Sequence, residues 1–286
     1  MREFFVFYAI YSFIMKAKKS LGQHFLRSEK ALSQIVDAAT ISAGDTVVEI
    51  GPGEGILTER LLEKARIVIA IEKDRDLIPI LQERFARELQ IGKLILIHQD
   101  ILAVDMGTVI KNLSSYKLVA NIPYYITGAI IEKFLSAKYQ PSLMVLLMQK
   151  EVADRIIARD KKMSILSVAI NAYGVPTLVG KVPPGAFVPP PTVDSGILLI
   201  EGISRDFFAG PNGCDETVFL KVMKAIFGNK RKQIGGTLTE FLHDKTLAQQ
   251  VLHDSGIDTK TRPEDIDVAT WKKLTQTLGR TTAAVV

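Results

Sequence analysis

Residues 47–61 read VVEIGPGEGILTERL, and this stretch decides the fold. A short β-branched run is followed by a turn with glycines at 51, 53 and 55, and then by an amphipathic stretch typical of a helix. Glycine permits the tight turn and lets backbone amides approach a ligand that a Cβ atom would exclude. The stretch predicts a strand, a turn and a helix that bind a nucleotide-like ligand, although a tight turn without any ligand is an alternative at this point.

The same alternation of apolar runs and helix-period stretches continues along the chain. Continuous apolar runs are typical of strands that helices cover on both faces. We therefore predict an α/β fold, with an open, mostly parallel, Rossmann-like sheet. Two further runs flank a proline-rich loop, PPGAFVPPPTV, and predict an antiparallel sheet edge. The strand-like runs lie at 46–50, 66–73, 94–100, 116–122, 143–150, 177–182 and 195–202.

The pattern changes after Ser204, where a turn-rich segment leads into helical periodicity without strand runs. We predict a Rossmann-like domain at 15–203 and a small all-helical, RNA-contacting domain at 204–286. The apolar run Phe4–Ile14 spans eleven residues, too few for the roughly 20 that cross a bilayer. We interpret 1–14 as an N-terminal extension; an extra docked helix or a membrane-touching segment is the alternative.

The composition is that of a globular chain, and its mild positive charge fits a polyanionic partner and ordinary solubility equally well. Of the 286 residues, 47% are hydrophobic and 23% charged, and the formal net charge is +5. The single cysteine, Cys214, fits a reducing compartment, so we expect a cytoplasmic protein. The four histidines show no metal-ligand spacing, and we expect no metal.

Polar or glycine residues stand at four consecutive strand ends: Gly51, Glu72, Asp100 and Asn121. Ligands of open α/β sheets bind outside the carboxyl ends of the strands, so we expect these residues to line one crevice. Glu72 would accept hydrogen bonds from ribose hydroxyls, and Asp100 from an adenine amine. The GxGxG spacing, in place of GxGxxG, favours S-adenosylmethionine over a nicotinamide dinucleotide.

The tetrapeptide Asn121-Ile122-Pro123-Tyr124 predicts chemistry on an exocyclic amine. That amine is a weak nucleophile because its lone pair is delocalised into the ring. The Asn121 side-chain oxygen and the Pro123 carbonyl would accept its hydrogens and favour a pyramidal nitrogen, mainly in the transition state. Tyr124 and Phe187 would sandwich the base, unless both are core aromatics.

These motifs resemble those of the ribosomal RNA adenine N6,N6-dimethyltransferases, and among them the bacterial kasugamycin-resistance enzymes. The resemblance covers about Lys18 to Leu278 and rests on KSLGQHFL, EIGPGEGILT, QDIL, NIPYYIT, QKEVADRI and FVPPPTVDS. It implies dimethylation of two adjacent adenosines in a 3'-end loop of 16S rRNA during small-subunit biogenesis. Tyr125 stands where the family usually has asparagine. The implied cofactor-binding residues are Gln23, His24, Leu26, Gly51, Gly53, Glu72, Lys73, Asp100, Ile101 and Asn121, and the implied catalytic residues are Asn121, Pro123, Tyr124 and Phe187.

Several lysines and one arginine form two basic groups, one before the core and one at the start of the helical domain. Beside an adenine-methylating site they would contact RNA phosphates, although a solvated helix face is the alternative. We expect a monomer that acts on small-subunit rRNA and the pre-30S particle, without a membrane partner. The residues are Lys16, Lys18, Lys19, Lys221, Lys224, Lys230, Arg231 and Lys232.

Three other functions stay open on sequence. One is a macrolide-resistance methyltransferase of large-subunit rRNA, which shares the NIPY tetrapeptide. Another is a ribosome-assembly factor in which catalysis is dispensable. The third is a nicotinamide oxidoreductase, which the GxGxG turn disfavours.

Overall fold

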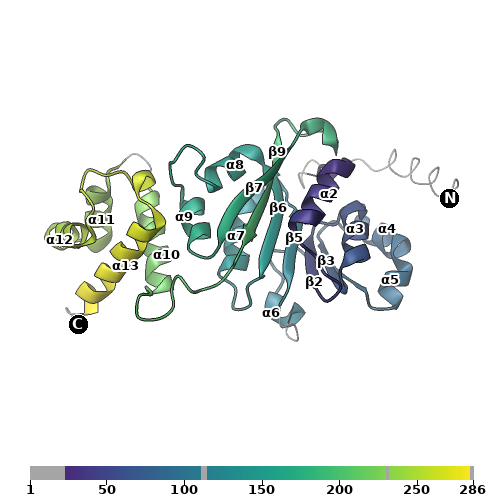
Figure 1. The fold of residues 1–286 in the computed structure, drawn as a ribbon, viewed down its shortest axis with the longest axis horizontal. Coiled ribbons are helices and arrows are strands. Elements are labelled where there is room, and N and C mark those ends of the chain that lie inside the picture. The colour runs from purple at the N-terminus through teal and green to yellow at the C-terminus, as the bar shows by residue number, and fades with distance from the viewer. Residues whose placement is uncertain (1–22, 111–114, 230–231, 284–286) are drawn as a thin grey trace.

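The computed structural model describes residues 23–110, 115–229 and 232–283. Its centre is a seven-stranded sheet with the strand order β4-β3-β2-β5-β6-β9-β7 (Figure 1). The strands are β2 Thr46–Ile50, β3 Ile67–Glu72, β4 Leu94–His98, β5 Lys117–Asn121, β6 Leu143–Gln149, β7 Val175–Val182 and β9 Ser195–Glu201.

Strands β2 to β6 are parallel, whereas β9 pairs antiparallel with β6 and β7. Every residue of β2 is buried, as expected for a strand covered on both faces. In β7 exposed and partly buried positions alternate, which is typical of a sheet edge. The predicted parallel sheet with an antiparallel edge is therefore confirmed.

Helices cover both faces of the sheet. One apolar cluster joins Val47 and Val68 to residues of α2, α3 and α4, and the other joins Val48 and Ile69 to residues of α6, α7, α8 and α9. Alternate residues of each strand point to opposite faces, so one strand supplies both clusters. The helices are α2 Glu29–Ala38, α3 Ile56–Lys64, α4 Leu77–Arg84, α5 Ala86–Gln90, α6 Met106–Val109, α7 Thr127–Leu135, α8 Lys150–Ile156 and α9 Ile165–Asn171.

A small second sheet ties the start of the described chain to the proline-rich loop. Strand β1, Phe25–Leu26, pairs antiparallel with β8, Phe187–Val188. The Arg27 amide donates to the Ala186 carbonyl over 2.7 Å and extends the pairing. A short 3-10 helix, η3, Pro184–Ala186, precedes β8. Residues 23–27 are thus held across the ends of the central strands.

The C-terminal part of the described chain is helical, as predicted, and lies at one end of the molecule (Figure 1). Its apolar core includes Phe219 and Trp271, and this core is continuous with the cluster under the sheet. The domain division at 203/204 stays a prediction. The elements are α10 Glu216–Phe227, α11 Ile234–Leu242, α12 Lys245–Ser255, the 3-10 helix η4 Pro263–Asp265 and α13 Val268–Ala283.

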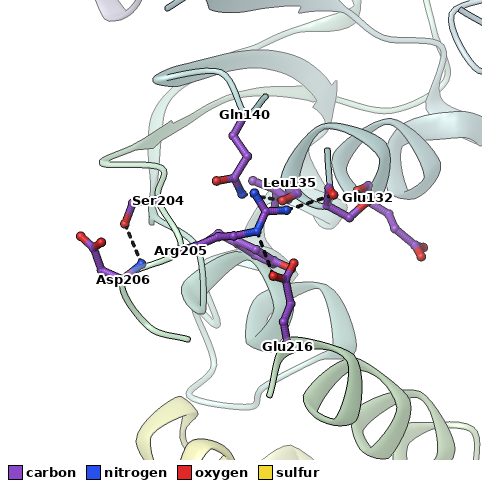
Figure 2. Close-up of polar contacts among 9 residues, drawn as sticks. Glu132, Leu135, Gln140, Ser204, Arg205, Asp206 and Glu216 are labelled. Atoms are coloured by element: carbon purple, nitrogen blue, oxygen red, sulfur yellow. Dashed lines mark hydrogen bonds and ion pairs between the residues drawn. The ribbon is translucent and has the colours of Figure 1, made fainter. Parts of the chain in front are cut away.

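A polar network joins the two parts; we call it the junction, and it consists of Ser136, Tyr173, Arg205 and Glu216. Figure 2 shows Arg205 between Glu216 of α10 and the end of α7. Arg205 Nε donates to Glu216 Oε2 over 2.8 Å, and its Nη2 donates to the Ser136 carbonyl over 3.0 Å. The Tyr173 hydroxyl donates to Glu216 Oε1 over 2.6 Å. Each charged group here has a protein partner.

Several predictions concern residues outside the described ranges. They are the extension at 1–14 and the RNA contacts of Lys16, Lys18, Lys19, Lys230 and Arg231. Within the described ranges, the helices all fall short of the length and apolarity needed to traverse a bilayer.

Candidate active site

A cleft of about 210 Å³ opens at the carboxyl ends of β2, β3 and β5. The register explains this position, because Ile50 pairs with Ile71 and Ala120, so the three strands end together. All ten residues with a predicted cofactor-binding role line this cleft, and so do Pro123 and Tyr124. The ten are Gln23, His24, Leu26, Gly51, Gly53, Glu72, Lys73, Asp100, Ile101 and Asn121.

The glycine turn forms one wall of the cleft, and its backbone requires glycine. Gly51, Gly53 and Gly55 have φ angles of +67°, +61° and +85°. A Cβ atom on Gly55 would lie 2.5 Å from the Phe85 ring, and one on Gly53 would lie 3.1 Å from the Phe25 ring. The turn is therefore packed from both sides, and its amides stay close to the cleft.

The Glu72 carboxylate is fixed at the end of β3 and is 6% exposed. Its Oε2 accepts from the Gly53 amide over 3.2 Å, and its Oε1 accepts from the Asp74 amide over 2.7 Å. Burial raises the pKa of Glu72, and the two amides oppose that rise. A carboxylate offers about four acceptor sites, so hydroxyl donors of a ligand still find acceptors here.

Asp100 lies two residues beyond β4, at the rim. Its Oδ2 pairs with Lys73 Nζ at 2.8 Å, and its Oδ1 accepts from the Leu102 amide over 3.0 Å. The hydrogen bond from Lys73 lowers the pKa of Asp100, with a further contribution from the Leu102 amide. Asp100 is therefore ionised at neutral pH and remains an acceptor.

The amide of Asn121 is oriented by the N-terminal segment. Its Nδ2 donates to the His24 carbonyl over 3.1 Å, and the His24 Nδ1 atom lies 2.8 Å from the Pro189 carbonyl oxygen. This contact fixes which end of the planar amide is the acceptor. None of the residues that the structure describes donates to Asn121 Oδ1, which leaves that oxygen to a ligand.

Tyr124 is held by two contacts. Its ring stacks with the His24 ring, with centroids 6.0 Å apart and an interplanar angle of 21°. Its hydroxyl lies 2.7 Å from Ser195 Oγ, and burial raises the pKa of Tyr124, so the phenol is neutral at physiological pH. The Pro123 carbonyl accepts from the Ile126 amide over 3.2 Å and keeps a second lone pair.

The structure buries Phe187 in the core, and its contact with the base stays a prediction. Phe187 is 3% exposed and is not among the cleft-lining residues. It pairs with Leu26 across the small sheet and packs in the apolar cluster beneath it. The alternative, a core aromatic, describes Phe187, whereas the partly buried Tyr124 does line the cleft.

The basic residues of the helical part lie away from the cleft-lining set. Lys221 is exposed, but Lys224 pairs with Glu132 and Lys232 pairs with Glu240. These carboxylates partly neutralise the expected phosphate track. The RNA contacts of these lysines stay a prediction.

The sequence reasoning missed two polar residues near the cleft. Ser195 anchors Tyr124, and it ends the FVPPPTVDS motif, which is the signal that could have found it. Glu49, on β2, is 1% exposed, and neither of its oxygens has a hydrogen-bond partner among the described residues. Burial raises the pKa of Glu49 to about 8, with a contribution from the charge of Glu72.

An open α/β sheet with this glycine turn, strand-end carboxylates and an oriented asparagine defines a nucleoside-binding methyltransferase. The model of the family described as ribosomal RNA adenine dimethylase matches residues 14–279. The chain belongs to this family.

Curated relatives agree with this family. A protein from Dehalococcoides mccartyi named ribosomal RNA small subunit methyltransferase A is 43% identical over 263 residues, which are 92% of this chain and 88% of the relative. A protein of the same name from Clostridium botulinum is 38% identical over 261 residues, 91% of this chain and 93% of the relative.

Solved structures agree on the fold. A dimethyladenosine transferase from Plasmodium falciparum gives a TM-score of 0.75 at 25% identity and covers 91% of this chain and 98% of its own. The 23S rRNA methyltransferase ErmE is similar in fold, with a TM-score of 0.69 at 24% identity. The match covers 89% of this chain and 99% of ErmE.

The comparisons confirm the predicted family and the predicted fold class. The chain is a methyltransferase, with S-adenosylmethionine as its methyl donor. The nicotinamide oxidoreductase, the large-subunit methyltransferase and the factor without required catalysis are not favoured.

Proposed function

We propose that this chain dimethylates N6 of two adjacent adenosines in a 3'-end loop of 16S rRNA, acting on the pre-30S particle. The observation that carries the proposal is the orientation of Asn121. Its Nδ2 is held by the His24 carbonyl, so its Oδ1 is the acceptor presented to the cleft. An acceptor at that point matches an amine that carries two hydrogens.

The described residues fit S-adenosylmethionine. The positive-φ glycines would let the adenosyl and amino-acid parts lie against the backbone, and Glu72 and Asp100 would accept from ribose hydroxyls and the adenine amine. Leu26 and Ile101 are buried apolar residues of the lining, suited to an adenine ring. When bound, the cofactor supplies an electrophilic methyl group on a positively charged sulfur.

Asn121 and Pro123 would prepare the target nitrogen. When Asn121 Oδ1 and the Pro123 carbonyl accept the two N6 hydrogens, the nitrogen lone pair is withdrawn from the ring and localised. These hydrogen bonds strengthen as positive charge develops on nitrogen, so they stabilise the transition state more than the ground state. A strong base is not required, because the alkylated amine is acidic enough to release its proton to water.

Tyr124 would hold the adenine ring. Stacking with His24 and the contact with Ser195 fix the position of its ring before the substrate arrives. A ring that is already ordered loses little conformational entropy when it stacks on a base. Because the target base must leave its stack to reach this ring, we expect recognition of a splayed-out loop adenosine.

We further infer that the chain works as a monomer in the cytoplasm. The single cysteine fits a reducing compartment, and the net charge of +5 fits a polyanionic substrate.

Mass spectrometry of digested small-subunit rRNA tests the function. Small subunits that lack the modification are incubated with S-adenosylmethionine and the wild-type chain or Asn121→Ala. We expect N6,N6-dimethyladenosine with the wild type and none with the variant. The exposed Asn171→Ala, in α9, is the matched control and should methylate normally. Unmodified adenosine after incubation with a folded wild-type chain that binds S-adenosylmethionine would overturn the proposal.

A further inference from the structure

Tyr125 is a large aromatic side chain that the contacts within the chain do not explain. It belongs to the 3-10 helix η2, Tyr124–Ile126, at the mouth of the cleft. It is 64% exposed, the highest exposure among the large apolar side chains of the described chain. Among the described residues, no hydrogen bond or ring contact involves its side chain.

The local backbone separates Tyr125 from its neighbour Tyr124. Successive side chains of a 3-10 helix point about 120° apart. Tyr124 therefore faces Ser195 and His24, while Tyr125 projects from the cleft toward solvent. Tyr125, Lys73 and Asp100 all line the cleft, and Lys73 and Asp100 form an ion pair at its rim.

We propose that Tyr125 stacks on the base next to the target adenine and so is a positioning residue of this enzyme; this rests on the function proposed above. A target base that enters the cleft leaves its neighbour without a stacking partner. An exposed tyrosine ring at the mouth replaces that partner, and base–aromatic stacking contributes about 1–3 kcal/mol per base. Since the ring belongs to the same helix as Tyr124, it supports the adjacent nucleotide while Tyr124 holds the target.

The stacking predicts a specific preference. A purine has a larger π face than a pyrimidine, so a purine next to the target adenosine should bind best. Two adjacent adenosines satisfy this preference, whichever of them occupies the cleft. Removing the ring should weaken RNA binding more than it slows methyl transfer from the bound complex.

The test is a double-mutant cycle between Tyr125 and the flanking base. Equilibrium affinity is measured for the wild type and Tyr125→Ala with a loop RNA that carries either an intact or an abasic nucleotide beside the target, on each side in turn. We expect Tyr125→Ala to weaken binding of the intact RNA about tenfold, about 1.4 kcal/mol. On the side where Tyr125 stacks, the abasic RNA lacks the stacked base, so we expect the wild type and Tyr125→Ala to bind it with almost the same affinity. Tyr125→Phe should bind like the wild type, because it keeps the π face.

Tyr139→Ala is the matched control, because Tyr139 is 44% exposed and lies outside the cleft-lining set. S-adenosylmethionine affinity, measured in parallel, should be the same in all variants. Equal loss on intact RNA and on RNA that is abasic at either side would overturn the stacking role, as would unchanged affinity in Tyr125→Ala. If the coupling is present but the wild type transfers no methyl group, the proposed function fails while the role of Tyr125 stands.

Discussion

The cleft and the junction use similar polar groups in opposite ways. At the junction, Arg205 donates to Glu216 (Figure 2). Tyr173 donates to the other oxygen of Glu216, so each of these polar groups is paired within the chain. In the cleft, Asn121 Oδ1 has no donor among the described residues. Because the His24 carbonyl holds Asn121 Nδ2, the Oδ1 atom is oriented within the cleft and remains available to a ligand. The junction stabilises the fold, whereas the cleft is organised for a molecule from outside.

The largest effect should come from Asn121→Ala. We expect kcat to fall about a thousandfold, about 4 kcal/mol, because the variant loses an acceptor that acts mainly in the transition state. Thermal unfolding should change little, since Asn121 is only partly buried. Single-turnover methylation, compared with the Asn171→Ala control, measures this effect. A rate within threefold of the wild type would refute the role of Asn121.

Phe187→Ala tests whether Phe187 acts in the apolar core or in the cleft. Because Phe187 is buried, we expect the free energy of unfolding to fall by about 3 kcal/mol. Val188→Ala, on the same strand but 51% exposed, should change it by less than about 1 kcal/mol. Denaturant titration of both variants checks this. If Phe187→Ala loses methylation while its free energy of unfolding is unchanged, Phe187 acts in the cleft and not in the core.

The buried Glu49 carboxyl makes the free energy of unfolding depend on pH. Its folded pKa of about 8 lies above its ordinary value of 4.5, so the folded state holds a proton that the unfolded state releases between these values. Stability contributed by this group therefore decreases as pH rises, by about 1.4 kcal/mol per unit in the middle of that window.

Glu49→Gln removes this proton linkage while it keeps the shape of the side chain. The stability difference between variant and wild type should grow in favour of the variant from pH 5 to pH 8. Denaturant titrations at four pH values measure the difference. A difference that stays constant with pH would show that Glu49 ionises normally. Glu83→Gln, on the exposed side of α4, is the control.

The smallest effect should come from the ion pair of Lys224 with Glu132, which bridges α10 and α7 at 2.6 Å. Both side chains are largely exposed, so Lys224→Ala should lower the unfolding free energy by no more than about 1 kcal/mol. Its kcat should equal that of the wild type. A double-mutant cycle with Glu132→Ala measures the pair, and a large drop in RNA affinity would instead support the predicted phosphate contact.

The sequence predicted the cleft well because its residues follow from local patterns. Gly51, Glu72, Asp100 and Asn121 each stand at or just beyond the end of an apolar run, and parallel strands bring such ends to one edge. The predicted and observed strand boundaries differ by only a few residues. The run predicted at 94–100, for example, forms β4, which ends at His98.

The features that the sequence did not predict depend on contacts between residues that are far apart in the chain. Phe187 is buried because β8 pairs with β1, more than a hundred residues earlier. The contact of Tyr124 with Ser195 joins residues 71 apart, and the pair of Lys224 with Glu132 joins residues 92 apart. No local periodicity encodes such pairs, so neither the burial of Phe187 nor the neutralisation of Lys224 could be predicted.

A crystal structure of the chain with S-adenosylmethionine tests the cleft most directly. We predict the ligand at the carboxyl ends of β2, β3 and β5, with its ribose hydroxyls on the Glu72 carboxylate and its adenine amine at Asp100. A ligand that binds with the same affinity in solution but occupies another surface, and leaves Glu72 and Asn121 without contacts to it, would contradict this assignment.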